Sequence, residues 1–439
     1  MIHGDVLALA SALHADGLAG KIDLVYLDPP YASERDYVAE ARLDGPADGR
    51  VSRTRAYEDR WSNGVGSYLD MLAPRLDALV SLLAETGTIW VHVDWRASYL
   101  VRALLDEILG RDAFRNEIVW RRAPNLGRQA ASGQFGRTLD TIVVYGKPRA
   151  IIRPPTRLEP IDEASIRWDD EGRPFTSAPR GDYTDASIAK LEKIGRVHRT
   201  KAGKVYIKYF LVKDAAGVWC RERRVDALWT DVPPLRHVAA SERTGFPTQK
   251  PRALLERIVT CATPPGGLVV DAFAGSGTTA VAANAVGRRA ILGDKSALAI
   301  AAARARLLRE GAGFSIERGG GAVDAERAPT VRATVRGGVV KLVEPKEPLA
   351  WSIGTERAGV FHGIWHGVRA PGARSVPAPR EAPLPAHLVR ASDVRVRVFS
   401  DDGGVATKSI AVSPRRDEQP EVSREARADR AEGAERADP

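Results

Sequence analysis

The chain has 439 residues, and its 65 Lys and Arg against 56 Asp and Glu give it a net charge of +9. It is longer than one ordinary domain, and its hydrophobic fraction of 44% suffices for a substantial core. The basic excess favours a polyanionic partner. The two cysteines, Cys220 and Cys261, form no CxxC pair, which excludes a disulfide scaffold and a cysteine zinc site. We therefore expect no bound metal and a reducing compartment.

No stretch of the chain predicts a membrane segment. No apolar run reaches the roughly 18–20 residues that a membrane-spanning helix needs. The first residues also lack the charged and apolar sections of a signal peptide. We expect a soluble, cytoplasmic protein with no membrane partner.

Residues 1–150 alternate short apolar runs with helical patterns, which predicts parallel strands joined by crossover helices. Leucines at helical spacing mark one helix over 67–84, and a second helix over 98–109 ends at Gly110. The strands are expected at 1–3, 22–27, 88–93, 117–120 and 141–145. The strand over 22–27 leads directly into the sequence Asp28-Pro29-Pro30-Tyr31.

From 151 to 243 this periodicity fades and basic residues accumulate. Between Lys190 and Arg224 there are eleven Lys and Arg against three Asp and Glu, interleaved with aromatic residues. A charged run by itself is typical of a solvated surface, but the aromatics and the central position favour contact with DNA. The candidate nucleic-acid-binding residues here are Lys193, Arg196, Arg199, Lys201, Lys204 and Lys208.

The alternation of helix and strand returns after Arg243. Helices are expected over 249–261, 278–286 and 297–308, and strands over 268–272 and 289–292. Together with the first block this makes about seven strands, which one doubly wound α/β sheet holds.

The last part of the chain has a different character. Strand-like runs at 338–343, 394–399 and 408–412 predict a small β-rich appendage over 312–412, without indicating its role. Residues 413–439 are mostly charged residues and alanine, which is typical of a disordered tail. The chain thus divides at 150, 243, 311 and 412.

A glycine turn follows the strand over 268–272, in the order Asp271-Ala-Phe273-Ala-Gly275-Ser276-Gly277-Thr278. Without side chains, the two glycines let the backbone bend sharply and approach a ligand closely. Asp294 follows about twenty residues later, at the end of the next strand, where a carboxylate can accept two ribose hydroxyls. The alternatives are a plain strand-to-helix connection and a phosphate-binding turn. Asp294 and the absence of a third glycine favour a nucleoside without paired phosphates.

The Asp28-Pro29-Pro30-Tyr31 turn has a chemical interpretation besides that of a rigid proline turn. An exocyclic amine of a nucleobase is a poor nucleophile, because its lone pair is delocalised into the ring. The Asp28 carboxylate and the Pro29 carbonyl can accept its two N–H bonds, while Pro29 and Pro30 fix the backbone. Tyr31 offers a face on which the base can stack. We predict in-line methyl transfer that depends on positioning and electrostatics.

A base stacked in a duplex cannot reach such a turn, so base flipping is implied. Phe135 and Trp61 are candidates for the opposite wall of the pocket. For each aromatic taken alone, packing in the core is the commoner role.

With these residues in place, residues 1–310 resemble the β-class amino-methyltransferases of bacterial and phage restriction-modification systems. In this class the catalytic motif precedes the cofactor motif, a circularly permuted order, and a target-recognition region lies between them. The string Phe246-Pro-Thr248-Gln249-Lys250-Pro251 closely matches the class's Pro-Thr-Gln-Lys-Pro string. Phe114 to Trp120 and Asp140 to Tyr145 are also similar to segments of the class.

The resemblance implies a Rossmann-like sheet that binds S-adenosyl-L-methionine, with a catalytic half at 1–150, a target-recognition insert at 151–243 and a cofactor-binding half at 244–311. Thr248, Gln249 and Lys250 would line the methionine end of the cofactor, and Asp5 of the His3-Gly4-Asp5 segment would contact its adenine. Asp271, Phe273, Gly275, Ser276, Gly277, Thr278 and Asp294 complete the expected cofactor site. Relatives often extend further before the His-Gly-Asp segment, so either the first strand is shortened or the true start lies upstream.

The leading functional hypothesis is a site-specific DNA methyltransferase acting on N6 of adenine, with double-stranded DNA as its partner. In the class, Asp-Pro-Pro-Tyr favours adenine and Ser-Pro-Pro-Tyr is commoner for N4 of cytosine, which is the first alternative. A DNA-binding module without catalysis is the second. RNA and protein-glutamine methyltransferases place the cofactor motif first and therefore fit less well. A restriction endonuclease and a second copy of the chain stay open as further partners.

Overall fold

The computed structural model describes residues 1–42, 51–124, 133, 135–200, 202–320, 328–336, 338–346, 348–357, 360–369, 378–385, 388, 394–400 and 405–412. The chain forms two compact units, divided after 326. The expected disordered tail at 413–439 lies outside the described residues, as does Lys201.

The first unit is built on a nine-stranded mixed sheet. Its order is β14 (Leu228–Trp229), β6 (Phe114–Arg121), β7 (Leu139–Gly146), β5 (Leu83–Val93), β2 (Ile22–Leu27), β15 (Leu268–Asp271), β16 (Arg289–Asp294), β1 (Ile2–His3) and β17 (Glu317–Arg318). The strands from β5 to β17 pair in parallel, and β7 is antiparallel to both of its neighbours. Because β2 pairs with β15, the N-terminal and C-terminal halves of the domain join within one sheet.

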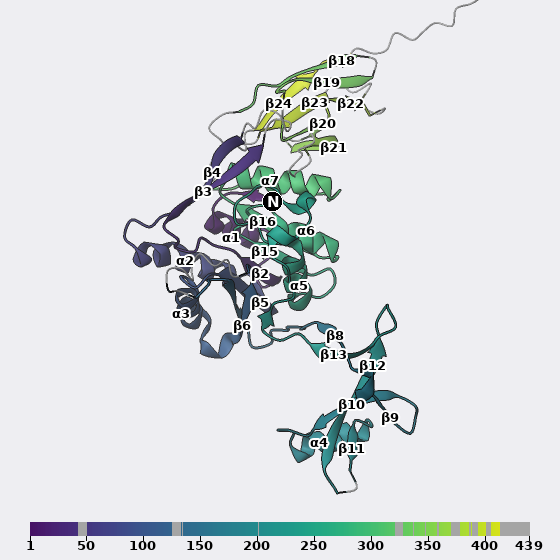
Figure 1. Ribbon diagram of the computed structural model, residues 1–439. Helices are drawn as coiled ribbons and strands as arrows, with labels where there is room; N and C mark the ends of the chain where they lie inside the picture. The colour runs from purple at the N-terminus through teal and green to yellow at the C-terminus, as the bar shows by residue number, and fades with distance from the viewer. Residues whose placement is uncertain are drawn as a thin grey trace, which may run out of the picture. The chain divides into compact units, whose positions relative to one another are not determined.

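Helices cover both faces of this sheet (Figure 1). One face carries α1 (Val6–Ala15), α2 (Val65–Val80) and α3 (Ser98–Leu109), and the other carries α5 (Arg252–Ala262) and α6 (Thr278–Ala285), followed by α7 (Ala297–Arg309). Alternate residues of β2 supply the two cores, since Val25 and Leu27 pack with the first group and Leu24 and Tyr26 with the second. This two-sided burial explains why the strands read as nearly continuous apolar runs.

The expected doubly wound α/β sheet is confirmed, and each of the seven strands predicted for it is present. The two extra strands, β14 and β17, have two residues each and leave no periodic signal in the sequence. Two expected helix boundaries are wrong. The helix predicted over 249–261 begins only at Arg252, after Pro251. The helix predicted over 67–84 ends at Val80, because Leu83 already pairs with Ile22 at the start of β5.

A hairpin of β3 (Arg35–Arg42) and β4 (Val51–Asp59) was not predicted. It directly follows the Asp28-Pro29-Pro30-Tyr31 turn in the chain. Ala32 and Glu34, between that turn and the hairpin, both have positive φ, at 55° and 57°.

The insert after β7 is an antiparallel sheet of six strands with one helix. Its order is β8 (Thr156–Pro160), β13 (Trp219–Arg224), β12 (Val205–Lys213), β10 (Pro174–Pro179) and β9 (Arg167–Trp168), with β11 (Val197–Arg199) also on β12. The helix α4 (Asp185–Lys193) is capped by the side chain of Thr184. The fading periodicity of this region therefore conceals a regular β structure.

The second unit is rich in β structure, as its strand-like runs predict. One sheet joins β18 (Arg332–Arg336), β19 (Val339–Glu344) and β22 (Glu381–Pro383), and the other joins β21 (Val360–Val368), β20 (Ala350–Arg357), β23 (Val394–Phe399) and β24 (Val405–Ile410). Both contribute to one core that contains Leu342, Trp351 and Val396. Of the helices that the structure describes, none has the length and apolar character needed to cross a membrane.

Candidate active site

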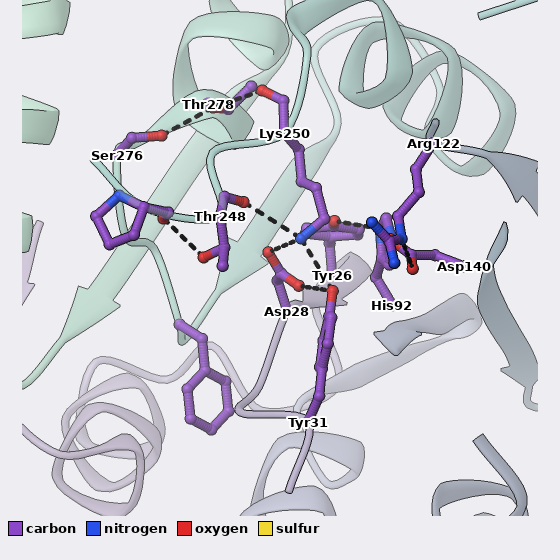
Figure 2. A network of polar contacts seen from close by, with 12 residues as sticks. Tyr26, Asp28, Tyr31, His92, Arg122, Asp140, Thr248, Lys250, Ser276 and Thr278 are labelled. Atoms are coloured by element: carbon purple, nitrogen blue, oxygen red, sulfur yellow. Dashed lines mark hydrogen bonds and ion pairs between the residues drawn. The ribbon is translucent and has the colours of Figure 1, made fainter. Parts of the chain in front are cut away.

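Asp28 lies at the carboxyl end of β2, where Lys250 and Tyr31 hold its carboxylate from two sides (Figure 2). The Tyr31 hydroxyl donates to Asp28 Oδ1 at 2.6 Å, and Lys250 Nζ donates to Asp28 Oδ2 at 2.5 Å. Lys250 Nζ also donates to the Tyr31 hydroxyl at 2.9 Å. Burial and the charge of Asp28 hold the pKa of Tyr31 well above its ordinary value. The phenol therefore keeps its proton and acts as a donor to Asp28.

A buried histidine supports Tyr31 from behind. The His92 ring stacks on the Tyr31 ring, with centroids 6.4 Å apart and planes 17° apart. His92 Nε2 donates to Asp140 Oδ2 at 3.2 Å, since a carboxylate can only accept, and Nδ1 then accepts from the Tyr26 hydroxyl at 3.2 Å. Burial, followed by the charge of Lys250, lowers the pKa of His92, so the ring stays neutral.

Asp140 connects this histidine to the surface. Burial by itself would raise its pKa, but the hydrogen bond from His92 and nearby positive charges bring the pKa below its ordinary value. Its other oxygen, Oδ1, forms an ion pair with Arg122 Nε at 2.7 Å.

Asp59, the last residue of β4, anchors the Asp28-Pro29-Pro30-Tyr31 turn and was missed by the sequence analysis. Its side chain is fully buried, and Oδ2 accepts the backbone N–H of Tyr31 at 3.1 Å and of Ser33 at 2.8 Å. Oδ1 accepts the indole N–H of Trp61 at 2.8 Å. The hairpin thus fixes both the turn that carries Tyr31 and a predicted pocket aromatic.

The glycine turn lies at the same edge of the sheet, between β15 and α6. Gly275 and Gly277 have φ of 48° and 73°, and a Cβ on Gly277 would lie 2.7 Å from the Cβ of Ala303. Asp294 Oδ2 accepts the Gly275 N–H at 3.0 Å, which joins the turn to the end of β16. Burial raises the pKa of Asp294.

Asp271 supports this turn from inside. Its Oδ1 accepts the Phe273 N–H at 3.0 Å, and its Oδ2 accepts the Thr279 hydroxyl at 2.5 Å. Burial is the main cause that raises the pKa of Asp271 to about 7.

The segment from Phe246 to Pro251 connects the glycine turn to Asp28. Gln249 Oε1 accepts from both the backbone N–H and the hydroxyl of Thr244, at 2.9 and 2.7 Å, so Gln249 fixes the loop itself. The Lys250 carbonyl accepts the Thr278 hydroxyl at 3.3 Å, and Thr248 adopts a φ of 59°. Lys250 therefore contacts α6 through its backbone and the Asp28-Pro29-Pro30-Tyr31 turn through its side chain.

A single pocket of about 150 Å³ collects these groups. Every predicted cofactor residue except Gly277 lines it, together with Asp28, Pro30 and Trp61. Pro29 and Tyr31 are outside its lining. The pocket also contains Tyr57 and Arg75, which sequence reasoning missed. Arg75 donates to Asp5 Oδ2 at 2.7 Å. Burial by itself would raise the pKa of Asp5, but this hydrogen bond and other favourable contacts lower the pKa below its ordinary value.

Phe135 does not line this pocket, contrary to expectation, because its side chain is 99% exposed. In the insert, Lys193 and Lys204 are exposed. Arg199 forms an ion pair with Glu192 at 3.0 Å, and Lys208 lies over the Phe175 ring, 5.0 Å from its centroid. Their role in nucleic-acid binding, and that of Arg196, stays a prediction.

Residues 22–304 match the sequence model of a family of N6 and N4 methyltransferases, described as DNA methylase. The chain is 27% identical over 306 residues to the type II methyltransferase M.EcaI of Enterobacter cloacae, covering 64% of this chain and 63% of the relative. It is 50% identical over 225 residues to the type II methyltransferase M1.MboII of Moraxella bovis, covering 51% of this chain and 72% of the relative. Among solved structures, the M1.HpyAVI–SAM complex aligns with 70% of this chain and 100% of that chain, at 16% identity and a TM-score of 0.38.

The chain spans less than two thirds of the length of the first curated relatives that it matches, 63% in the case of M.EcaI.

Asp59→Ala should lower both stability and methyl transfer. It leaves two backbone N–H groups and the Trp61 indole without their buried acceptor, at about 1–3 kcal/mol for each unpaired group. Thermal unfolding and transfer from radiolabelled S-adenosylmethionine measure the two effects. Asp36→Ala is the control, because Asp36 lies in the same hairpin and its carboxylate forms an exposed ion pair with Arg60. Equal behaviour of the two variants would contradict the anchoring role.

The raised pKa of Asp271 predicts a pH-dependent stability. Its folded pKa of about 7 exceeds the ordinary value of 3.8, so between these values the folded chain holds a proton that the unfolded chain has lost. This contribution is complete below the unfolded pKa and disappears as the pH rises through about 7. We expect the wild-type unfolding midpoint to fall, relative to that of Asp271→Asn, between pH 5 and pH 8. Parallel midpoints across this range would refute the assignment.

Proposed function

Because the chain belongs to the family of DNA methylases that modify N6 of adenine or N4 of cytosine, we propose that it methylates N6 of adenine in duplex DNA. S-adenosylmethionine is the methyl donor of this family. One observation carries the proposal: Asp28 of the Asp-Pro-Pro-Tyr turn lines the same pocket as Phe273 and Gly275 of the glycine turn.

The pocket suits a cationic nucleoside that carries hydroxyl groups. The carboxylates of Asp5 and Asp294 line it, and each carboxylate oxygen has a second acceptor site beside the bonds described above. The positive φ at Gly275 and a Cβ-to-ring distance of only 3.1 Å to Phe246 leave no room for a larger residue in the turn. We propose that Asp294 binds the ribose, that Asp5 lies at the adenine end and that Thr248 to Lys250 lie at the methionine end.

Asp28 orients the amine that receives the methyl group. Its carboxylate can accept an N–H of the amine while it keeps the bonds from Tyr31 and Lys250. This directs the lone pair of the nitrogen towards the sulfonium methyl group, and the negative charge stabilises the positive charge that develops on nitrogen during transfer. Asp28 acts by position and charge and need not be a strong base.

Lys250 positions Asp28 rather than the substrate. Its ammonium bonds to Asp28 and to the Tyr31 hydroxyl, and it lies 5.3 Å from the centre of the Tyr31 ring. The orientation of the carboxylate is therefore set before any substrate binds. Tyr31 in turn is fixed by the His92 ring and by Asp59, and its proposed role is to stack on a flipped base.

N4 of cytosine presents the same amine geometry and is the alternative target. The presence of an acid at position 28 supports adenine. A DNA-binding module without catalysis is a weaker alternative, since Asp28 and Gly275 line one pocket and Tyr31 donates to Asp28. An endonuclease partner, a dimer and a cytoplasmic location stay predictions.

Asp28→Ala should nearly abolish methyl transfer and leave S-adenosylmethionine binding largely intact. The reason is that Asp28 contacts the amino group of the target base and not the nucleoside part of the cofactor. Asp28→Asn keeps an acceptor but loses the charge, so we expect a loss on the order of a hundredfold, as for other groups that stabilise transition-state charge. Calorimetric titration with the cofactor and single-turnover transfer separate binding from chemistry. Full activity in Asp28→Ala would disprove the catalytic assignment.

The target base is tested by methylation-aware sequencing of a methyl-free host that expresses the full chain. We expect N6-methyladenine at one short sequence motif. N4-methylcytosine at such a motif would contradict adenine as the target base and support cytosine instead. The absence of any new methylation, together with intact cofactor binding, would favour the non-catalytic module.

A further inference from the structure

Three exposed aromatic side chains and two arginines occur in the chain regions that follow β5 and precede β7. They are Trp95, Arg96, Tyr99, Phe135 and Arg137, which we call the Trp95 surface. Trp95 is 49% exposed, Tyr99 62% and Phe135 99%. Large exposed aromatics grouped with cations are unusual on a surface that only faces water.

The indole of Trp95 lies between two guanidinium groups. The Arg137 guanidinium lies 4.3 Å from the ring centre and that of Arg96 lies 4.9 Å from it. Arg96 forms an ion pair with the buried carboxylate of Asp94, which fixes its position. The cations thus hold the indole in place while half of its surface stays accessible.

A short chain of contacts connects Trp95 to the catalytic turn. Tyr31 stacks on His92, which bonds to Asp140, which pairs with Arg122. Arg122 Nη2 donates to the backbone carbonyl of Arg137 at 3.3 Å. The strand register is consistent with this. Leu27 of β2 is opposite Val91 of β5, so Trp95 comes three residues after the position opposite Asp28.

We propose that the Trp95 surface binds duplex DNA beside the flipped base, with Arg96 and Arg137 on phosphates and Trp95, Tyr99 and Phe135 against exposed base or sugar faces. This rests on the proposed function. Asp94 and Asp140 are buried and pair with Arg96 and Arg122, and the exposed guanidinium of Arg137 adds a positive charge that complements a phosphate backbone. Aromatic faces beside such cations suit bases that lose their stacking partner when a neighbour is flipped.

The test compares Trp95→Ala with Ile151→Ala, and Arg137→Gln with Arg149→Gln. Ile151 is 41% exposed and its backbone bonds to Thr86, near the opposite end of β5. Arg149 is an exposed arginine two residues before it. Each variant of the full chain is assayed for transfer from radiolabelled S-adenosylmethionine to sheared duplex DNA from a methyl-free host, across a range of salt concentrations. Calorimetric cofactor binding and the thermal midpoint are measured in parallel.

We expect Trp95→Ala to lower kcat/KM for duplex DNA at least about fivefold, the lower end of losses at stacking aromatics, with cofactor binding and midpoint unchanged. Arg137→Gln should reduce the slope of log KM against log salt concentration by about 0.9, the amount expected when one phosphate contact is lost. Both control variants should match the wild type.

Wild-type kinetics in Trp95→Ala and an unchanged salt slope in Arg137→Gln would overturn the proposal. They would indicate that the Trp95 surface binds a protein partner and not DNA. If Trp95→Ala unfolds, the salt slope of Arg137→Gln decides by itself. A wild-type chain that binds S-adenosylmethionine but methylates no DNA would refute the proposed function instead, and this outcome is visible before any variant is made.

Discussion

The bond between Lys250 and Asp28 joins two segments that lie 222 residues apart in the sequence. The backbone of Lys250 is bonded to α6 through Thr278, and its side chain reaches Asp28 and Tyr31. The turn that carries the acid and the turn that carries the glycines are therefore held in one geometry. Transfer of a methyl group between two bound molecules depends on such fixed positions more than on a strong base.

The central sheet makes this bond possible. β2 and β15 are parallel neighbours with Tyr26 opposite Asp271, and β15 and β16 are parallel with Asp271 opposite Leu292. The residues that follow these strands must emerge at one edge. Asp28, Asp271 and Asp294 meet there for this reason, which is the general reason why ligands bind at the carboxyl ends of parallel strands.

The sequence predicts the sheet well, because strands buried on both faces and the helices between them leave clear apolar patterns. It also predicts most of the pocket, since strand ends and glycine turns have local signatures. The role of Asp59 could not be predicted, because an acid at the end of a short hairpin acquires its three donors only in the folded chain. Lys250 was expected at the cofactor, and its bond to Asp28 depends on a tertiary contact that no local pattern encodes.

The central claim is that the bound methyl donor faces Asp28. A crystal structure of the full chain with S-adenosylhomocysteine tests it most directly. We predict that the nucleoside contacts the glycine turn and Asp294, and that its sulfur points towards the space in front of Asp28. A nucleoside bound away from the glycine turn, or a sulfur directed away from Asp28, would contradict the account.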